Sequence, residues 1–198
     1  MASLSKKINT GVKFVFVSFL LVMTLQHTAF AQAKKQVRKI PDAIKQLEFL
    51  MGKWEGKVAS ETGPVVTNKE YSATYEFSKV LNGAAIKVSA THKEVKPDSS
   101  FESSGIIGYD TSSKQLHIFL VNDAGETYDL KGNWTNMTTL NFTYEGVRNA
   151  KKMLVNMWLS KMDGNKIEIK TYTTIGEELL ITDDAILNKV VAPKTDHK

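Results

Sequence analysis

Aromatic side chains that recur at alternate positions are the residues of this sequence best suited to hold a ligand. Tyr71, Tyr75 and Phe77 fall on one face of the segment 67–80, because alternate residues of a strand point to the same side of a sheet. The further aromatic candidates are Phe119, Tyr128, Trp134, Phe142, Trp158 and Tyr172. If these faces point inward, they line an apolar pocket with several phenolic hydroxyls, which suits a small hydrophobic or amphipathic ligand. The alternative is that the same rings fill a solid core.

Side chains for catalysis are sparse in this sequence. It contains neither the Gly-x-Ser-x-Gly pattern of serine hydrolases nor a phosphate-binding loop. Asp183 and Asp184 are adjacent, but neighbouring residues of a strand face opposite sides, so the two carboxyls cannot share a proton as catalytic pairs do. Asp110 lies in a predicted turn, where aspartate commonly accepts hydrogen bonds from its own backbone. We therefore predict no catalytic residue and a protein that is not an enzyme.

Metal-binding side chains are also few. The chain has four histidines and no cysteine, which excludes disulfides, thiolate metal sites, cysteine nucleophiles and a lipid-modified N-terminal cysteine. His27 and His197 lie near the two ends, so His92 and His117 are the histidines of the central region. Two histidines without cysteines argue against a structural zinc site. The sequence predicts neither a bound metal nor a cofactor.

The first 31 residues indicate a cleavable secretory signal peptide. Lys6 and Lys7 supply the positive charge, residues 14–23 form the apolar core, and an Ala-Phe-Ala sequence precedes a cleavage site before Gln32. A membrane-spanning helix needs about 20 apolar residues, roughly twice the length of this run. We therefore expect a periplasmic or secreted protein without stable membrane insertion.

The net charge changes when this segment is removed. The full chain carries a formal charge of +5, but the predicted signal peptide contains three lysines and no acidic residue. The remainder therefore carries 23 basic and 21 acidic residues. Several of the basic residues cluster at 34–39, which we interpret as a solvated linker, although such a segment could touch anionic lipid or nucleic acid. We predict no nucleic-acid binding and no particular oligomeric state.

One short helix and about ten strands must position these side chains. Pro41 and Asp42 favour a helix start, apolar residues then recur at helical spacing, and Gly52 ends the helix. The predicted strands are 54–60, 67–80, 84–95, 101–109, 115–121, 126–134, 139–146, 152–162, 166–174 and 179–187. Short turns join them, and Asn82-Gly83 is a typical hairpin sequence.

This pattern is typical of an all-β, antiparallel up-and-down barrel with one short N-terminal helix. Barrels of eight or more strands can enclose a small ligand. The predicted organisation is a signal peptide at 1–31, a basic flexible linker at 32–40, one barrel at 41–190 and a disordered tail at 191–198.

Three short motifs carry a resemblance to known barrels. Gly52-x-Trp54 follows the predicted helix, Gly105-Ile-Ile-Gly-Tyr-Asp110 precedes a strand, and Gly132 precedes the strand start at Thr139-Leu140. In these motifs the chain resembles the lipocalin-like (calycin) barrels, and in particular the DUF1579 family of bacterial proteins of unknown function. The resemblance implies that Gly52 and Trp54 close one end of the barrel. Lipocalins place an arginine late in the chain against this tryptophan, and here Lys189 is the nearby cation.

The leading hypothesis is an exported barrel that binds a small hydrophobic or amphipathic molecule. One alternative is a protein-interaction module with a filled interior. A second follows from the resemblance, because related barrels that bind haem use one histidine as the axial ligand; His117, beside Phe119, is the candidate. The least favoured alternative is an enzyme at the barrel mouth.

Overall fold

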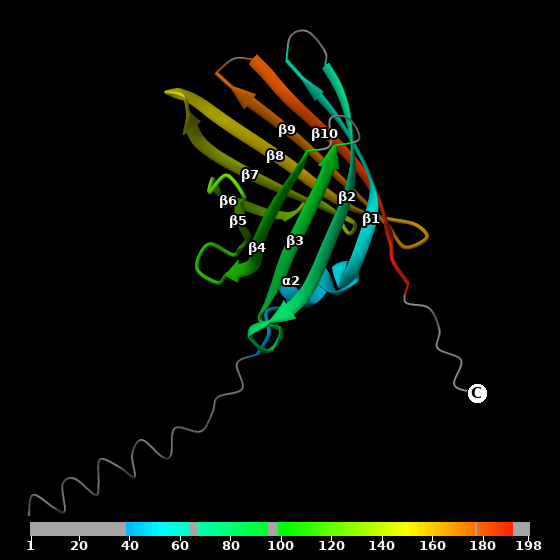
Figure 1. The fold of residues 1–198 in the computed structure, drawn as a ribbon. Coiled ribbons are helices and arrows are strands. Elements are labelled where there is room, and N and C mark those ends of the chain that lie inside the picture. Colours follow the sequence, from blue (N-terminus) through cyan, green and yellow to red (C-terminus); the bar gives the residue numbers. More distant parts are fainter. Residues whose placement is uncertain (1–38, 64–66, 95–98, 177, 192–198) are drawn as a thin grey trace, which may run out of the picture. The chain divides into compact units, whose positions relative to one another are not determined.

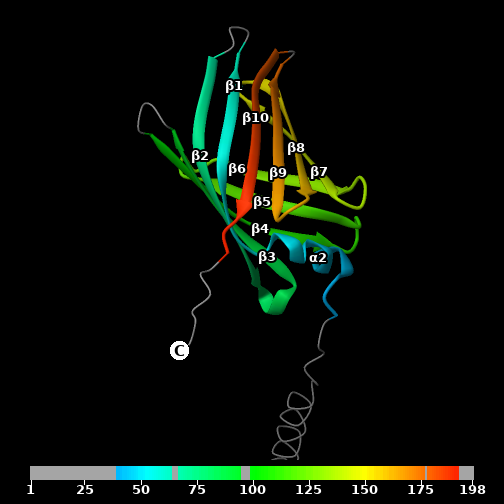
Figure 2. The ribbon, with the colours of Figure 1, turned by 90° about the vertical axis from the view of Figure 1, so that its right-hand side faces the viewer.

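Ten antiparallel strands form one closed barrel in the computed structural model, which describes residues 39–63, 67–94, 99–176 and 178–191. Each strand pairs with the next along the chain, and β10 closes the barrel against β1 (Figures 1 and 2). The elements are α2 (Asp42–Lys45), the 3₁₀ helices η1 (Gln46–Leu50) and η2 (Leu81–Gly83), β1 (Gly52–Thr62), β2 (Thr67–Val80), β3 (Ala85–Glu94), β4 (Ser100–Asp110), β5 (Gln115–Asn122), β6 (Thr127–Trp134), β7 (Thr139–Arg148), β8 (Lys151–Met162), β9 (Lys166–Ile175) and β10 (Glu178–Lys189).

The predicted up-and-down barrel is confirmed, and every strand begins and ends within two residues of its predicted bounds. The predicted signal peptide at 1–31, residues 32–38 of the predicted linker and residues 192–198 of the predicted tail lie outside the described residues. None of the helices in the described part of the chain is long and apolar enough to cross a bilayer.

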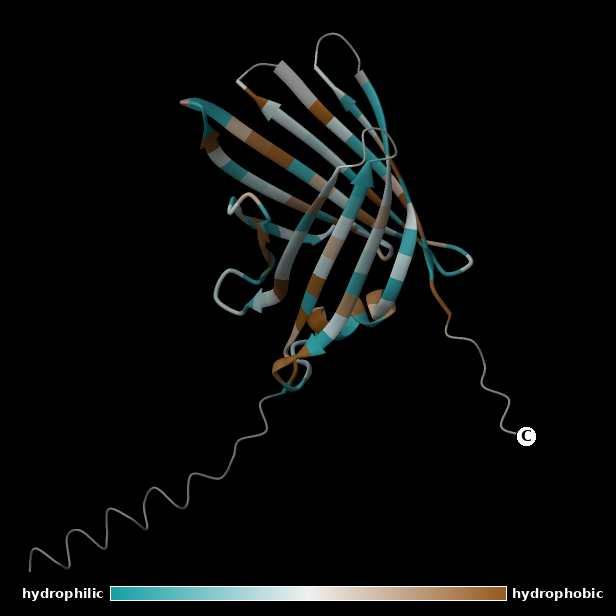
Figure 3. Cartoon of the chain, in the orientation of Figure 1, coloured by the Kyte–Doolittle hydropathy of each residue, from teal (hydrophilic) through white to brown (hydrophobic). Residues whose placement is uncertain are grey.

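Alternating side chains give the barrel its two faces. Bands of hydrophobic and hydrophilic residues follow one another along the strands (Figure 3). In β3, for example, Ile86, Val88 and Ala90 are buried, and the residues between them are more exposed. This period of two buries one set of side chains inside the barrel and leaves the other set outside.

The helical segment covers one end of the barrel. Ile44, Leu47 and Leu50 are buried there and pack into the core. The segment differs from the single predicted helix, because only Asp42–Lys45 is α-helical and Gln46–Leu50 tightens to a 3₁₀ helix, as short helix ends often do.

Trp54 anchors this closed end. Its indole Nε1 donates a hydrogen bond to the carbonyl oxygen of Leu50 at 2.6 Å, which ties β1 to η1. The Lys189 ammonium lies over the indole ring of Trp54, 5.3 Å from its centroid. Gly52, at the junction, adopts a φ of +108°, a conformation that favours glycine. Trp134 packs nearby against Phe49, with ring centroids 6.3 Å apart.

The pairing between β6 and β7 is the shortest in the barrel. It consists of four residue pairs, between residues 131–134 and 140–143. Beyond these pairs, two side-chain contacts join this region: the rings of Tyr128 and Tyr144 are 5.3 Å apart, and an ion pair of 3.3 Å links Arg148 to Glu126, the residue just before β6. Side chains rather than backbone hydrogen bonds therefore hold this part of the wall together.

Candidate ligand-binding cavity

The barrel encloses a cavity of about 430 Å³. This volume lies within the range of ligand pockets, which is roughly 300–1,000 Å³. The apolar lining residues are Val58, Phe77, Val88, Ala90, Phe101, Ile107, Ile118, Leu120, Leu130, Met153, Val155, Met157, Leu159, Ile169, Ile181 and Ala185. The polar lining residues are Ser60, Thr62, Tyr71, Tyr75, His92, Ser103, Tyr128, Arg148, Thr171, Thr173 and Asp183. The interior is therefore not filled, which argues against the alternative of a solid barrel.

The polar groups of the lining are concentrated on one side of this cavity, whereas apolar groups occur on both sides. Most of the polar residues come from β9, β10, β1, β2 and β3, which are neighbours in the barrel. The strands β4, β5, β6 and β8 contribute mainly aliphatic and methionine side chains, and Ser103, Tyr128 and Arg148 are the polar exceptions on that side. A ligand in the cavity would meet most of the hydrogen-bonding groups on one side and a mainly apolar surface on the other.

A continuous series of rings crosses three neighbouring strands, β2, β3 and β4. Phe101 stacks on His92 at a centroid distance of 4.4 Å, and His92 meets the edge of Tyr75 at 5.4 Å. Tyr75 in turn stacks against Phe77 at 6.3 Å. All four rings line the cavity, so this series forms one aromatic part of its wall.

His92 is the buried histidine of this wall. The hydroxyl of Tyr75 lies 3.0 Å from its Nε2, and its Nδ1 has no hydrogen-bond partner among the described residues. Burial lowers the pKa of His92 to about 4, so the imidazole is neutral at physiological pH. Burial, together with the nearby charge of Asp183, raises the pKa of the Tyr75 phenol, which therefore stays protonated.

Asp183 lies at the centre of a polar row across three strands. Its cross-strand partners are Ser60 on β1 and Thr171 on β9, and all three residues line the cavity. Burial raises the pKa of the Asp183 carboxyl, and the hydroxyl of Ser60 opposes part of this shift. The next residue, Asp184, faces the outside, where its carboxylate lies 3.6 Å from the ammonium of Lys170. The two aspartates therefore point to opposite faces, as predicted.

Two ion pairs lie near the end of the cavity away from α2. Glu94 accepts a hydrogen bond from Ser99 at 2.7 Å and pairs with Lys69 at 2.8 Å. Glu126 pairs with Arg148 and accepts a hydrogen bond of 2.8 Å from Tyr128. Burial and this hydrogen bond raise the pKa of Tyr128 to about 12. Lys69 and Arg148 thus each already have a carboxylate partner.

Four of the nine aromatic residues proposed from the sequence line the cavity: Tyr71, Tyr75, Phe77 and Tyr128. The other five are placed elsewhere: Phe119 is half exposed on the outer face, Trp158 packs against the partly exposed Tyr172 with centroids 5.4 Å apart, Trp134 contacts Phe49, and Phe142 is buried in the core. Aromatic residues occur on both faces of these strands, so their presence alone does not identify the inner face.

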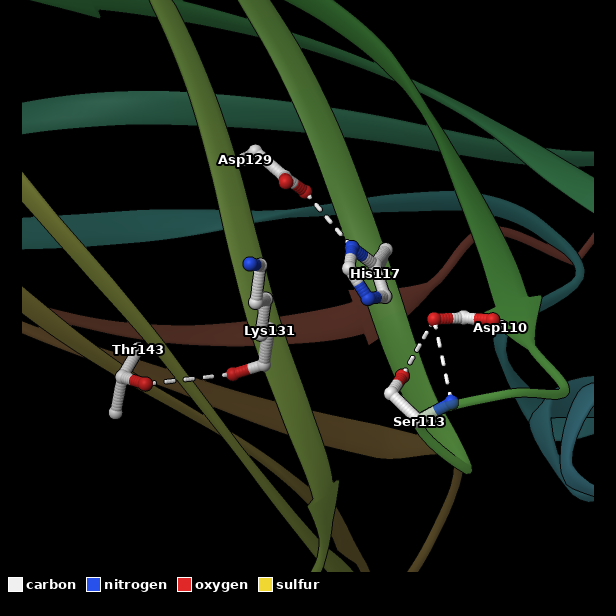
Figure 4. Close-up of polar contacts among 6 residues, drawn as sticks. All are labelled: Asp110, Ser113, His117, Asp129, Lys131 and Thr143. Atoms are coloured by element: carbon white, nitrogen blue, oxygen red, sulfur yellow. Dashed lines mark hydrogen bonds and ion pairs between the residues drawn. The ribbon is translucent and has the colours of Figure 1, made fainter.

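The hypothesis that His117 ligates a haem inside the barrel is wrong, because the His117 side chain does not point into the interior. His117 and Phe119 alternate with Leu116, Ile118 and Leu120, and the latter set points inward. Figure 4 shows His117 on β5 turned toward Asp129 on the neighbouring strand, and its Nδ1 lies 3.0 Å from the carboxylate. The same view shows Asp110 accepting hydrogen bonds from Ser113 in the β4–β5 turn, the turn-stabilising role predicted for it.

His92 and Asp183 were not among the site residues predicted from the sequence, yet both continue an inward series. His92 follows Val88 and Ala90 at intervals of two, and Asp183 precedes Ala185 and Leu187 at the same interval. Strand periodicity could therefore have placed both side chains inside. Within the described residues, no group of three or more histidine, aspartate and glutamate side chains is arranged to hold a metal ion.

Comparisons with known proteins agree with this fold. A family model described as "Protein of unknown function (DUF1579)" matches residues 42–178. The crystal structure of Rv2717c from M. tuberculosis is similar, with a TM-score of 0.56 and 15% identity over 77% of this chain and 100% of that chain. The S-type phycobiliprotein lyase CPES from Guillardia theta has a TM-score of 0.51 and 8% identity over 75% of this chain and 92% of that chain. No curated protein matches the sequence.

Proposed function

This chain belongs to the DUF1579 family of proteins of unknown function, and we propose that it is an exported, non-enzymatic barrel that binds a small hydrophobic or amphipathic molecule. The observation that carries the proposal is the cavity of about 430 Å³ with its polar and apolar walls. A well-formed apolar pocket with a few converging polar groups is the usual form of a small-molecule site.

The similar barrels support the fold and leave the ligand to be determined from this chain. One of them is named a phycobiliprotein lyase, but at 8% identity the likeness shows the fold alone. The size and lining of the cavity are therefore the basis of the proposal, and no reaction is assigned to it.

A dye whose emission responds to polarity tests ligand binding directly. None of the three tryptophans, all of which the structure describes, lines the cavity, so intrinsic tryptophan emission is a poor reporter of occupancy. Nile red is uncharged and fluoresces strongly in apolar surroundings. We expect a saturable increase of its emission on titration with the purified protein, and its displacement by linear alcohols. A titration without saturation, together with no displacement by any alcohol of the series, would overturn the proposal.

Export requires a separate test. The lysines, the apolar run at 14–23 and the Ala-Phe-Ala sequence before Gln32 support it. When the full-length chain is expressed in a Gram-negative bacterium, we expect periplasmic or secreted protein whose N-terminal residue is Gln32. Intact protein that keeps residues 1–31 in the cytoplasmic fraction would contradict export without affecting the binding proposal.

A further inference from the structure

We propose that the cavity selects amphipathic molecules that carry a protonated amine, and that Asp183 binds this amine. The inference rests on the proposed ligand-binding function and narrows it to one class of ligand. It follows from the position of Asp183, from the pairing of the surrounding charges and from the apolar wall across the cavity.

The surroundings of Asp183 match the geometry of an ammonium group. Asp183 lines the cavity between its cross-strand partners Ser60 and Thr171, so a carboxylate is flanked by two hydroxyls on adjacent strands. An ammonium group has three hydrogen-bond donors and no acceptor. A carboxylate with hydroxyl oxygens on both sides offers acceptors for these donors.

Asp183 is half-buried and lacks a cationic partner among the residues that the structure describes. Carboxylates drawn out of water are normally paired with a cation, because an isolated charge in apolar surroundings is costly. None of the ion pairs between described residues includes Asp183. Lys69 forms an ion pair with Glu94 at 2.8 Å, and Arg148 forms one with Glu126 at 3.3 Å. Burial without a cation also accounts for the raised pKa of the Asp183 carboxyl. A ligand ammonium would supply the missing partner.

An unpartnered imidazole lies on the same side of the cavity. His92 is 8% exposed, lines the cavity, and leaves Nδ1 without a hydrogen bond among the described residues. A buried polar atom of this kind usually has a partner, in the protein or in something bound to it. His92 is neutral, so it offers a hydrogen bond without repelling a cation.

The opposite wall fits the rest of such a molecule. Ile118, Leu130 and Val155 belong to the apolar lining contributed by β5, β6 and β8. A hydrocarbon tail or ring on that side would bury apolar surface while the amine reaches Asp183. An anionic head group would instead meet an unpaired carboxylate, and the one cavity-lining arginine already has a partner.

The test is displacement of bound Nile red by three molecules with the same ten-carbon chain: decylamine, decanol and decanoate. We expect decylamine to displace the dye at roughly tenfold lower concentration than decanol, because its charge-assisted hydrogen bond to Asp183 outweighs the cost of desolvating the amine. Decanoate should be the weakest competitor. This order is measured on the wild-type protein and needs no variant.

Asp183→Asn tests the assigned residue, and Asp184→Asn is its matched control on the outer face. Asp183→Asn should remove the advantage of decylamine over decanol, and Asp184→Asn should retain it. The inference is overturned if decanol displaces the dye as well as decylamine does, if decanoate is the best competitor, or if Asp183→Asn keeps the amine preference. If the protein does not bind Nile red and no member of the series binds, the proposed function itself fails.

Discussion

Lys189 and Trp54 are paired in the β1–β10 ladder, which closes the barrel, and the Lys189 ammonium lies 5.3 Å from the centroid of the Trp54 ring. The resemblance to lipocalins implies an arginine at this place, and a lysine makes the corresponding contact here. A cation over an indole is attracted by the negative face of the ring. The closed end thus combines this contact with the hydrogen bond from Trp54 to Leu50.

The first prediction concerns this contact. Lys189→Met keeps an aliphatic side chain over Trp54 but removes the charge, and it should lower the free energy of unfolding by about 0.5–2 kcal/mol. Lys189→Arg should retain or exceed the wild-type stability, because a guanidinium also stacks on an indole. Urea denaturation measures both. Equal stability of the methionine variant and the wild type would show that the charge contributes nothing.

The second prediction concerns the volume of the cavity. Ala90 lines the cavity opposite Tyr75 in the β2–β3 ladder, so Ala90→Trp would place an indole in the space proposed for the ligand. We expect this variant to fold and to lose at least tenfold in affinity for Nile red. Ala59→Trp is the matched control, since Ala59 lies on the exposed face of β1. Unchanged affinity of Ala90→Trp would place the dye outside the barrel.

The third prediction is loss of stability in acid because of His92. Its pKa is about 4 in the folded protein and 6.5 in the unfolded chain, so the unfolded state binds the proton more tightly. This group therefore has no effect well above pH 6.5, and it lowers the free energy of unfolding as the pH falls from 6.5 through 4, by up to roughly 3 kcal/mol. Denaturation curves of the wild type and His92→Gln across this range test it: an equally steep acid decline in both proteins would assign the decline to other groups.

The fourth prediction has the opposite sign. Burial raises the pKa of Asp183 above its ordinary value, so this group favours the folded state below the unfolded pKa and loses that contribution as the pH rises through the folded pKa. Asp183→Asn should therefore be more stable than the wild type at neutral pH, and this advantage should disappear in acid. Thermal unfolding of both proteins at neutral pH and in acid measures the difference in stability between the variant and the wild type. A less stable variant at neutral pH would show that the carboxylate is satisfied inside the protein.

The fifth prediction compares two glycines of β4. A Cβ at Gly105 would collide with the carbonyl oxygen of Phe119 and the side chain of Leu120, whereas a Cβ at Gly108 would meet open space. Gly105→Ala should lower the free energy of unfolding by at least about 1–3 kcal/mol. Gly108→Ala should change it by no more than about 0.5 kcal/mol. Similar losses in both variants would mean that the close approach of β4 and β5 is relaxed in solution.

The sequence was sufficient for the architecture and less so for the site. Alternation of apolar residues predicted all ten strands, because the period of two is a local property that each strand displays separately. The inner face was harder to assign. Phe119 and Tyr172 are aromatic but lie outside, and Asp183 is charged but lies inside. Only closure of the barrel decides which face is enclosed, and the pairing of β1 with β10 joins segments far apart in the sequence.

Periodicity nevertheless contained more information about the site than amino-acid type did. His92 and His117 were equally plausible by composition, yet His92 continues the buried series of β3 and His117 falls between the buried residues of β5. The pairing of charges could not be predicted in the same way. The partners Lys69–Glu94 and Arg148–Glu126 are at least 22 residues apart in the sequence, and they meet through the strand register.

The short pairing of β6 with β7 has a kinetic consequence. Ladders of nine and eleven pairs flank β1, so separating strands there would disrupt much of the barrel, whereas separating β6 from β7 breaks four pairs, one ring contact and one ion pair. We expect the wall to open transiently between β6 and β7, at a free-energy cost well below that of global unfolding. The rates at which a ligand enters and leaves the cavity would then depend on the Tyr128–Tyr144 contact. The affinity for the ligand would instead depend on the opposite side of the cavity, which carries Asp183. Residence time and selectivity could in that case change independently during evolution.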